Sequence, residues 1–174
     1  AADMNKQLIK QILIEQKEEI KRIFQEKIIP RGIITRIQKA FSSDLIKVIM
    51  GVRRCGKSVL AHYLLRDIKY GYINFDDERL IGVKTADLNN FLEVLLEIQP
   101  DSKVILLDEI QNVNAWELFV NRLKRNGYNL VITGSNSKLL SRELATHLTG
   151  RHFTIELYPF SFKEFLIYKN HPIN

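Results

Sequence analysis

The segment 51–58 carries residues whose types and spacing suit phosphate binding. It follows an apolar run at 45–50, is followed by Val59, and reads Gly51-Val52-Arg53-Arg54-Cys55-Gly56-Lys57-Ser58. A strand, a glycine-containing loop and a helix start form the context in which backbone N–H groups converge on phosphate oxygens. Lys57 would place an ammonium against β/γ-phosphates, and Ser58 would offer a hydroxyl to Mg²⁺. We therefore predict that residues 51–59 bind nucleotide. The alternative is a chance Gly-Lys turn.

A second segment ends an apolar run with two carboxylates. Residues 104–107 are all apolar, and Asp108 and Glu109 follow them. Such a run predicts a strand that is buried on both faces of a parallel sheet, and ligands of these sheets bind at the carboxyl ends of the strands. We predict that Asp108 holds Mg²⁺ and that Glu109 orients and activates an attacking water. The alternative is a pair of acids that simply ends a strand at the surface.

The elements that must position these residues alternate between strands and helices. The sequence predicts strands at about 45–50, 71–77, 104–108, 128–135 and 153–157. It predicts helices at 57–69, at 87–97 with Asp87 as the cap, at 116–123, at 138–147 and from Ser161 onward. This alternation indicates an α/β fold, a mostly parallel five-stranded sheet with helices on both faces in a three-layer sandwich.

The N-terminal segment, residues 4–28, precedes the first predicted strand and shows the pattern of a single long helix. Apolar residues recur at helical spacing over 4–28 with charged residues between them, and Pro30 ends the pattern. We predict an amphipathic helix that docks on the domain or on a partner, and a short helix at 33–43. The chain is accordingly divided into a helix at 1–30 and an ATP-binding domain at 31–174.

The composition of the chain limits the classes of protein to which it can belong. The chain has 174 residues and a net charge of +6, which permits an acidic partner such as nucleic acid, although no nucleic-acid motif supports one. No apolar run approaches the length of a membrane span. The single Cys55 fits a reducing compartment, so we expect a cytoplasmic protein. The four histidines show no metal-ligand spacing.

The two motifs also resemble those of a known superfamily. The first resembles a Walker A motif and the second a Walker B motif, and an additional predicted strand lies between them in the sequence. The chain resembles the AAA+ superfamily of P-loop ATPases, and more narrowly the prokaryotic AAA-type ATPases with a C-terminal domain of unknown function. The segments that carry this resemblance are 51–58, Leu-Leu-Asp-Glu-Ile-Gln (106–111) followed by Trp116, Thr-Gly-Ser-Asn-Ser (133–137), Leu-Thr-Gly-Arg (148–151) and Leu-Tyr-Pro-Phe-Ser-Phe-Lys-Glu-Phe-Leu (157–166). Members usually continue beyond this region, so the resemblance implies an ATPase core with weak turnover in isolation.

The resemblance implies secondary site residues as well. The fourth strand should end in a sensor of the γ-phosphate or the water. Thr133, Ser135 and Asn136 are the candidates; we favour the last two because they follow the strand, and a polar turn is the alternative. Asn74 would hold Glu109 inactive until a partner binds, or it is an ordinary asparagine at a sheet edge.

An arginine from a neighbouring subunit can stabilise the transferred phosphoryl group. Arg151 is the first candidate for this role, in a homo-oligomer, and Arg142 is the second. The alternative for either is a surface ion pair.

These features together predict Mg²⁺-dependent hydrolysis of ATP by an AAA+ type core. One rival is a regulatory module that senses ATP with negligible turnover. Another is a DNA-associated ATPase, motivated by the net charge of +6.

Overall fold

The computed structural model describes residues 4–24, 35, 37–38, 41–52, 56–135 and 152–157. Five strands form one sheet: β1 (Ile46–Gly51), β2 (Tyr70–Asn74), β3 (Val104–Asp108), β4 (Asn129–Gly134) and β5 (His152–Leu157). Their order is β2-β3-β4-β1-β5, and every neighbouring pair is parallel. The predicted α/β fold is confirmed. The strand that separates β1 from β3 in space is β4, whereas β2, which lies between them in the sequence, forms an edge.

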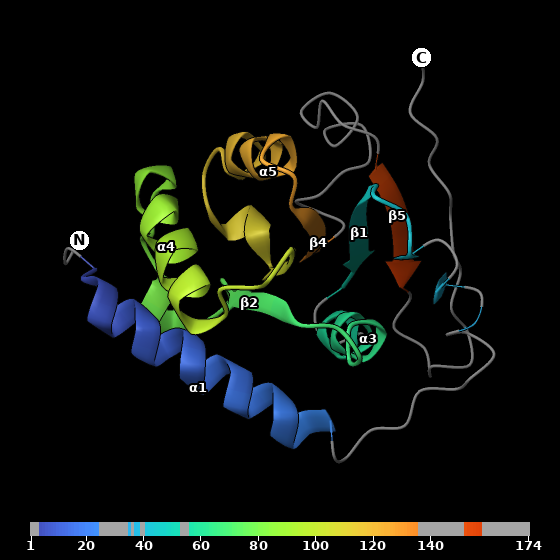
Figure 1. The fold of residues 1–174 in the computed structure, drawn as a ribbon, viewed down its shortest axis with the longest axis horizontal. Helices are drawn as coiled ribbons and strands as arrows, with labels where there is room; N and C mark the ends of the chain where they lie inside the picture. The colour runs from blue at the N-terminus through green and yellow to red at the C-terminus, as the bar shows by residue number, and fades with distance from the viewer. Residues whose placement is uncertain are drawn as a thin grey trace.

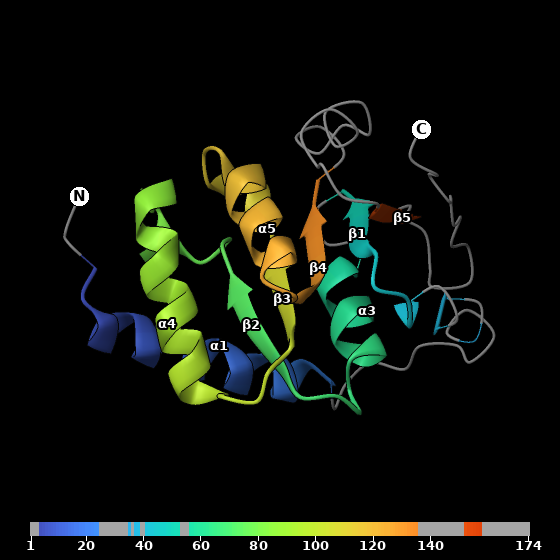
Figure 2. The ribbon, with the colours of Figure 1, turned by 45° about the horizontal axis from the view of Figure 1, so that its top comes forward.

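Helices cover both faces of the sheet (Figures 1 and 2). They are α1 (Lys6–Phe24), α3 (Lys57–Leu64), α4 (Leu88–Ile98) and α5 (Trp116–Arg125). Short 3₁₀ turns lie at Glu78–Leu80, Thr85–Asp87 and Ile110–Asn112. The predicted helices at 138–147 and after Ser161, and most of the one at 33–43, lie outside the described residues.

Two helix ends differ from the prediction. α3 stops at Leu64 instead of 69, because the chain turns at Leu65, with φ −98° and ψ 2°. Asp87 does not cap α4 with its side chain. Its carboxylate instead accepts the backbone N–H of Lys84 at 2.9 Å and closes the preceding turn. In both places a turn, which the apolar spacing does not reveal, decides the boundary.

The strands are buried on both faces, as their continuous apolar runs predict. In β1, Val48 and Met50 pack into the core under α4 and α5, while Ile49 packs into the core under α3. Trp116 is partly buried against the first of these cores. The sheet therefore fixes the carboxyl ends of β1, β3 and β4 beside one another.

Helix α1 runs along the open edge of β2 and contacts α3 and α4 as well (Figures 1 and 2). Gln16, which is buried, donates to the backbone oxygen of Asn74 and accepts from its N–H, both at 2.9 Å. Lys17 donates to the backbone oxygen of Tyr70 at 2.7 Å. These bonds occupy edge groups that would otherwise be open to pairing with another chain. The N-terminal helix thus docks on the domain itself.

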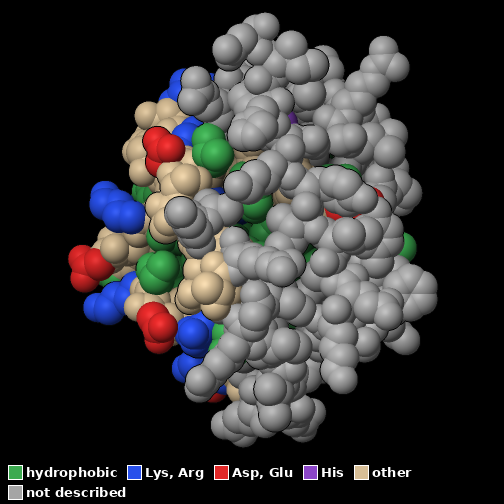
Figure 3. Space-filling model, turned by 90° about the vertical axis from the view of Figure 1, so that its right-hand side faces the viewer, with side chains coloured by type: hydrophobic (Ala, Val, Ile, Leu, Met, Phe, Trp, Pro, Cys, Tyr) green, Lys and Arg blue, Asp and Glu red, His purple; other side chains and the backbone are tan. Residues whose placement is uncertain are grey.

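On the face seen from the β5 side, the charged side chains that the structure describes do not gather in a patch of one sign (Figure 3). In the view from the β5 side, basic and acidic side chains are interspersed along the margin that the structure describes (Figure 3). Among the described residues, no helix is long and apolar enough to cross a membrane.

Candidate functional site

The described end of the loop after β1 is a left-handed glycine, Gly56. β1 ends at Gly51, and Gly56 precedes α3 with φ 92°, a left-handed conformation that side chains disfavour. Lys57 begins α3, and its Nζ donates to the backbone oxygen of Gly51 at 2.7 Å. The ammonium is therefore folded back over the loop. Residues 53–55 lie outside the described part of the chain.

Asp108 ends β3 and is buried, with 2% of its surface exposed. Hydroxyl groups from three elements donate to its carboxylate: Ser58 and Tyr72 to Oδ2, the latter at 3.0 Å, and Thr133 to Oδ1. Burial raises the pKa of the Asp108 carboxyl, and the hydrogen bonds from these hydroxyls oppose that rise. The carboxylate is thus fixed beside the start of α3.

Glu109 leaves the strand in a left-handed conformation, with φ 52° and ψ 45°. This conformation costs a residue with a side chain about 1–2 kcal/mol. The backbone N–H of Glu109 donates to Oγ1 of Thr133 at 3.0 Å. Its Oε1 pairs with Nζ of Lys57 at 2.9 Å, and its Oε2 accepts from Gln111 at 2.6 Å. The turn therefore brings the carboxylate back to the glycine loop.

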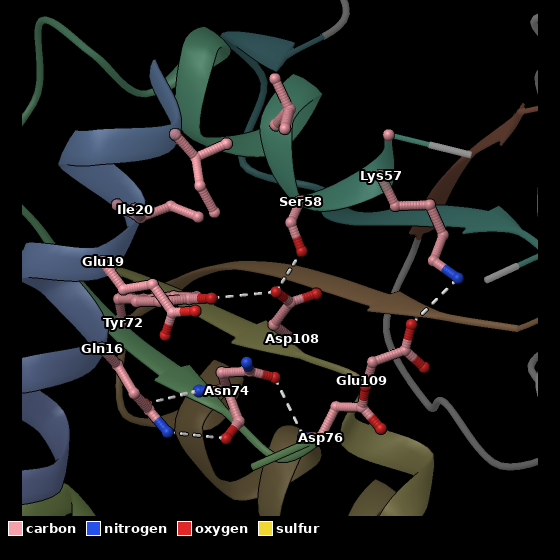
Figure 4. Close-up of a pocket in the computed structure, with 13 residues that line it drawn as sticks. Gln16, Glu19, Ile20, Lys57, Ser58, Tyr72, Asn74, Asp76, Asp108 and Glu109 are labelled. Carbon is pink, nitrogen blue, oxygen red and sulfur yellow. Dashed lines mark hydrogen bonds and ion pairs between the residues drawn. The ribbon is translucent and has the colours of Figure 1, made fainter. Parts of the chain in front are cut away.

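A cavity of about 550 Å³ lies against these residues. The loop, β2 and β3 form part of its lining, and α1 forms another wall with Gln16, Glu19, Ile20 and Ile23. Figure 4 shows Glu19 and Ile20 on the opposite side from Ser58 and Asp108. The amphipathic pattern of α1 predicted docking, but nothing in that pattern predicted a contribution to this cavity.

The sequence-predicted site residues divide into three groups. Lys57, Ser58, Asp108 and Glu109 come together as expected. Thr133, the sensor candidate that the sequence disfavoured, contacts both Asp108 and Glu109, whereas Ser135 follows the end of β4. A third group lies outside the described residues: Arg53, Arg54, Cys55, Asn136, Arg142 and Arg151. Sequence reasoning missed Tyr72, which lies in no motif, and Gln111, which lies in the segment 106–111 that carries the resemblance but was given no role there.

Asn74 lies in the cavity lining, but its side chain turns back on its own loop. Its Oδ1 accepts the backbone N–H of Asp76 at 2.9 Å, while the Glu109 carboxylate contacts Lys57 and Gln111. The geometry thus matches the ordinary asparagine at a sheet edge.

The oxygen ligands at this site suit a nucleotide bound together with a hard cation such as Mg²⁺. A hydroxyl and a carboxylate, Ser58 and Asp108, meet at the end of the loop. Magnesium is usually bound by one or two carboxylates together with substrate phosphates and water. Within the described ranges, no group of three or more His, Cys, Asp or Glu could hold a metal by itself. A metal here would share its coordination with phosphate.

Comparisons with known proteins agree with this picture. A family model described as AAA domain matches residues 43–166. Uncharacterized proteins of Methanocaldococcus jannaschii and Haemophilus influenzae are 41% identical over 173 residues and 45% identical over 140 residues. The matches cover 93% and 74% of this chain but 39% and 34% of the two relatives, so the chain spans well under half of their length. Among solved structures, a Walker-type ATPase of Pyrococcus abyssi shares the fold, with a TM-score of 0.54 and 16% identity over 78% of this chain and 55% of that one.

Proposed function

Because the chain belongs to the AAA domain family, we propose that it binds ATP with Mg²⁺ and hydrolyses ATP to ADP and phosphate. The observation that carries this proposal is the convergence of two segments at one sheet edge. Lys57 and Glu109 pair at 2.9 Å, and Ser58 donates to Asp108. The resemblance between the two segments and the Walker motifs assigns a role to each of these four side chains.

Each of these side chains has a separate role in the proposed phosphoryl transfer. Lys57 and the N–H groups at the start of α3 attract the phosphates. Ser58 and Asp108 would hold Mg²⁺, which supplies charge neutralisation at the phosphate oxygens when it is bound. Glu109 accepts a proton from water as the water oxygen attacks the terminal phosphorus and the bond to ADP breaks. Thr133 holds both carboxylate residues in place.

A contact between two of these side chains also supports the alternative function, an ATP-sensing switch with negligible turnover. The ion pair with Lys57 occupies Oε1 of Glu109, so the base and the phosphate ligand neutralise each other. This pair must open before either residue can act. The rate of ATP turnover would then depend on how completely nucleotide displaces Glu109 from Lys57. Measuring the rate of phosphate release distinguishes the enzyme from the switch.

Arg151 is proposed to act on a second copy of the chain. β5 begins at His152 beside Ile46, whereas the phosphate loop starts at Gly51, at the other end of β1. Five residues of strand span roughly 16 Å, at about 3.3 Å per residue. Because Arg151 directly precedes His152 in the sequence, this separation between His152 and Gly51 supports a role for Arg151 in a homo-oligomer.

The test of the proposed function combines two substitutions with Glu93→Gln, in an exposed ion pair, as a control. Lys57→Ala should remove most ATP affinity in calorimetry, and Asp108→Asn should weaken the dependence of binding on Mg²⁺. Unchanged affinity in Lys57→Ala would overturn the phosphate-loop assignment. Filter binding to DNA at two salt concentrations tests the nucleic-acid alternative, since phosphate contacts weaken as salt rises.

A further inference from the structure

Gln111 contacts the carboxylate that the proposed function uses as a base. Its Nε2 donates to Oε2 of Glu109 at 2.6 Å. Since an ionised carboxylate only accepts hydrogen bonds, the NH₂ end of the amide must face Glu109. The other end, Oε1 of Gln111, is buried and has no hydrogen-bond partner in the described part of the chain. Buried acceptors without partners are rare, so packing alone does not explain an amide at this position.

Glu109 is held at three points, and only one of them changes in the proposed reaction. Thr133 holds its backbone N–H at 3.0 Å, Lys57 holds Oε1 at 2.9 Å and Gln111 holds Oε2 at 2.6 Å. The proposed function draws Lys57 toward phosphate, which releases Oε1. The proposed function assigns no phosphate contact to Thr133 or Gln111, so the backbone and Oε2 stay in place.

We propose that Gln111 is a positioning residue for Glu109: it holds Oε2, so that Oε1 is the oxygen left to accept the proton of the attacking water. The left-handed turn at Glu109 sets the direction of the side chain, and Gln111 fixes the plane of its carboxylate. This inference rests on the proposed function, because it assigns a role only if Glu109 is the base.

The experiment replaces Gln111 with methionine, which has nearly the same length and has no donor for a hydrogen bond to a carboxylate. Gln11→Met is the matched control, since Gln11 donates to Glu15 at 3.1 Å on the exposed face of α1. Single-turnover hydrolysis of radiolabelled ATP resolves slow rates. We expect a fall of about 10- to 100-fold in Gln111→Met, in line with the effect of a small misplacement of a reacting group. Affinity for a non-hydrolysable ATP analogue and the melting temperature should stay close to wild type, and the control should match wild type in all three.

A second measurement separates positioning from packing. If Gln111 acts through Glu109, adding Gln111→Met to Glu109→Gln should not lower the residual rate further. A parallel loss of analogue affinity and stability, or a rate within about 2-fold of wild type, overturns the inference. Gln111→Ala repeats the test if the methionine variant folds poorly.

A third measurement needs no turnover. In ¹⁵N-labelled, nucleotide-free protein, the side-chain NH₂ of Gln111 should exchange with solvent slowly, and Glu109→Ala should abolish that protection. Equal exchange in both proteins overturns the contact. If the wild-type rate does not depend on Glu109 at all, the proposed function fails; if it does and Gln111→Met is normal, only this inference fails.

Discussion

Replacing Glu109 with glutamine should strengthen ATP binding while it removes hydrolysis. Nζ of Lys57 pairs with Oε1 of Glu109 at 2.9 Å, and the exposed fractions of the two side chains are 5% and 13%. At an effective dielectric constant of about 20, the gross attraction of such a pair is about 6 kcal/mol. Most of it is offset by desolvation, and a hydrogen bond to a charged group contributes about 1.5–3 kcal/mol net. The phosphates must displace Lys57 from Glu109 before they can bind it. Removing the charge of Glu109 should therefore raise ATP affinity about 10- to 100-fold.

The same substitution should lower the unfolding free energy of the protein measured without added ATP. Breaking a buried ion pair costs about 3–5 kcal/mol when the remaining charge has no partner. Lys57 keeps the backbone oxygen of Gly51 at 2.7 Å, so we expect a smaller loss of unfolding free energy, about 1–3 kcal/mol. ATP should reverse this loss, because it gives Lys57 a new anion.

Calorimetry with ATP and Mg²⁺, urea unfolding and phosphate release measure the three effects. Glu93→Gln is the matched control, because Lys6 and Glu93 form an exposed pair whose loss should change little. Equal or weaker ATP affinity in Glu109→Gln would refute the competition between Glu109 and phosphate for Lys57. Phosphate release at the wild-type rate would remove Glu109 from the mechanism.

Three further predictions concern stability and assembly. Burial lowers the pKa of His62 to about 3, so the unfolded chain takes up a proton that the folded chain excludes. The contribution of His62 to the unfolding free energy should fall by about 1.4 kcal/mol per pH unit as the pH is lowered from 6.5 to about 3. His62→Gln should remove that slope in urea titrations, and equal slopes would contradict the assignment. Gln16→Leu leaves the backbone N–H and oxygen of Asn74 without their partner, so urea unfolding should show a loss of about 2–4 kcal/mol, and a loss near zero would mean that water replaces the amide. Arg151→Ala mixed with Lys57→Ala should regain part of the ATPase activity that each lacks alone, and no recovery would return Arg151 to an ordinary surface pair.

The sequence by itself located the two motifs and predicted the class of the fold correctly. The spacing of glycines and Lys57 is local, and the left-handed Gly56 is a property of the loop itself. An apolar run that ends in Asp108 requires a buried strand, and parallel strands bring their carboxyl ends to one edge. Helix boundaries were less predictable, because turns such as the one after Leu64 leave no trace in the apolar spacing.

Only the tertiary structure decided which side chains meet at that edge. Strand order places β4 between β1 and β3, so Thr133 reaches Asp108 although 25 positions separate them. Packing places α1 along β2 and brings Glu19 to the cavity. The left-handed turn at Glu109 directs its carboxylate to Lys57 and Gln111. Periodicity describes which face of an element is buried, whereas these contacts depend on strand register, on sheet order and on a single backbone angle, none of which is encoded in local spacing.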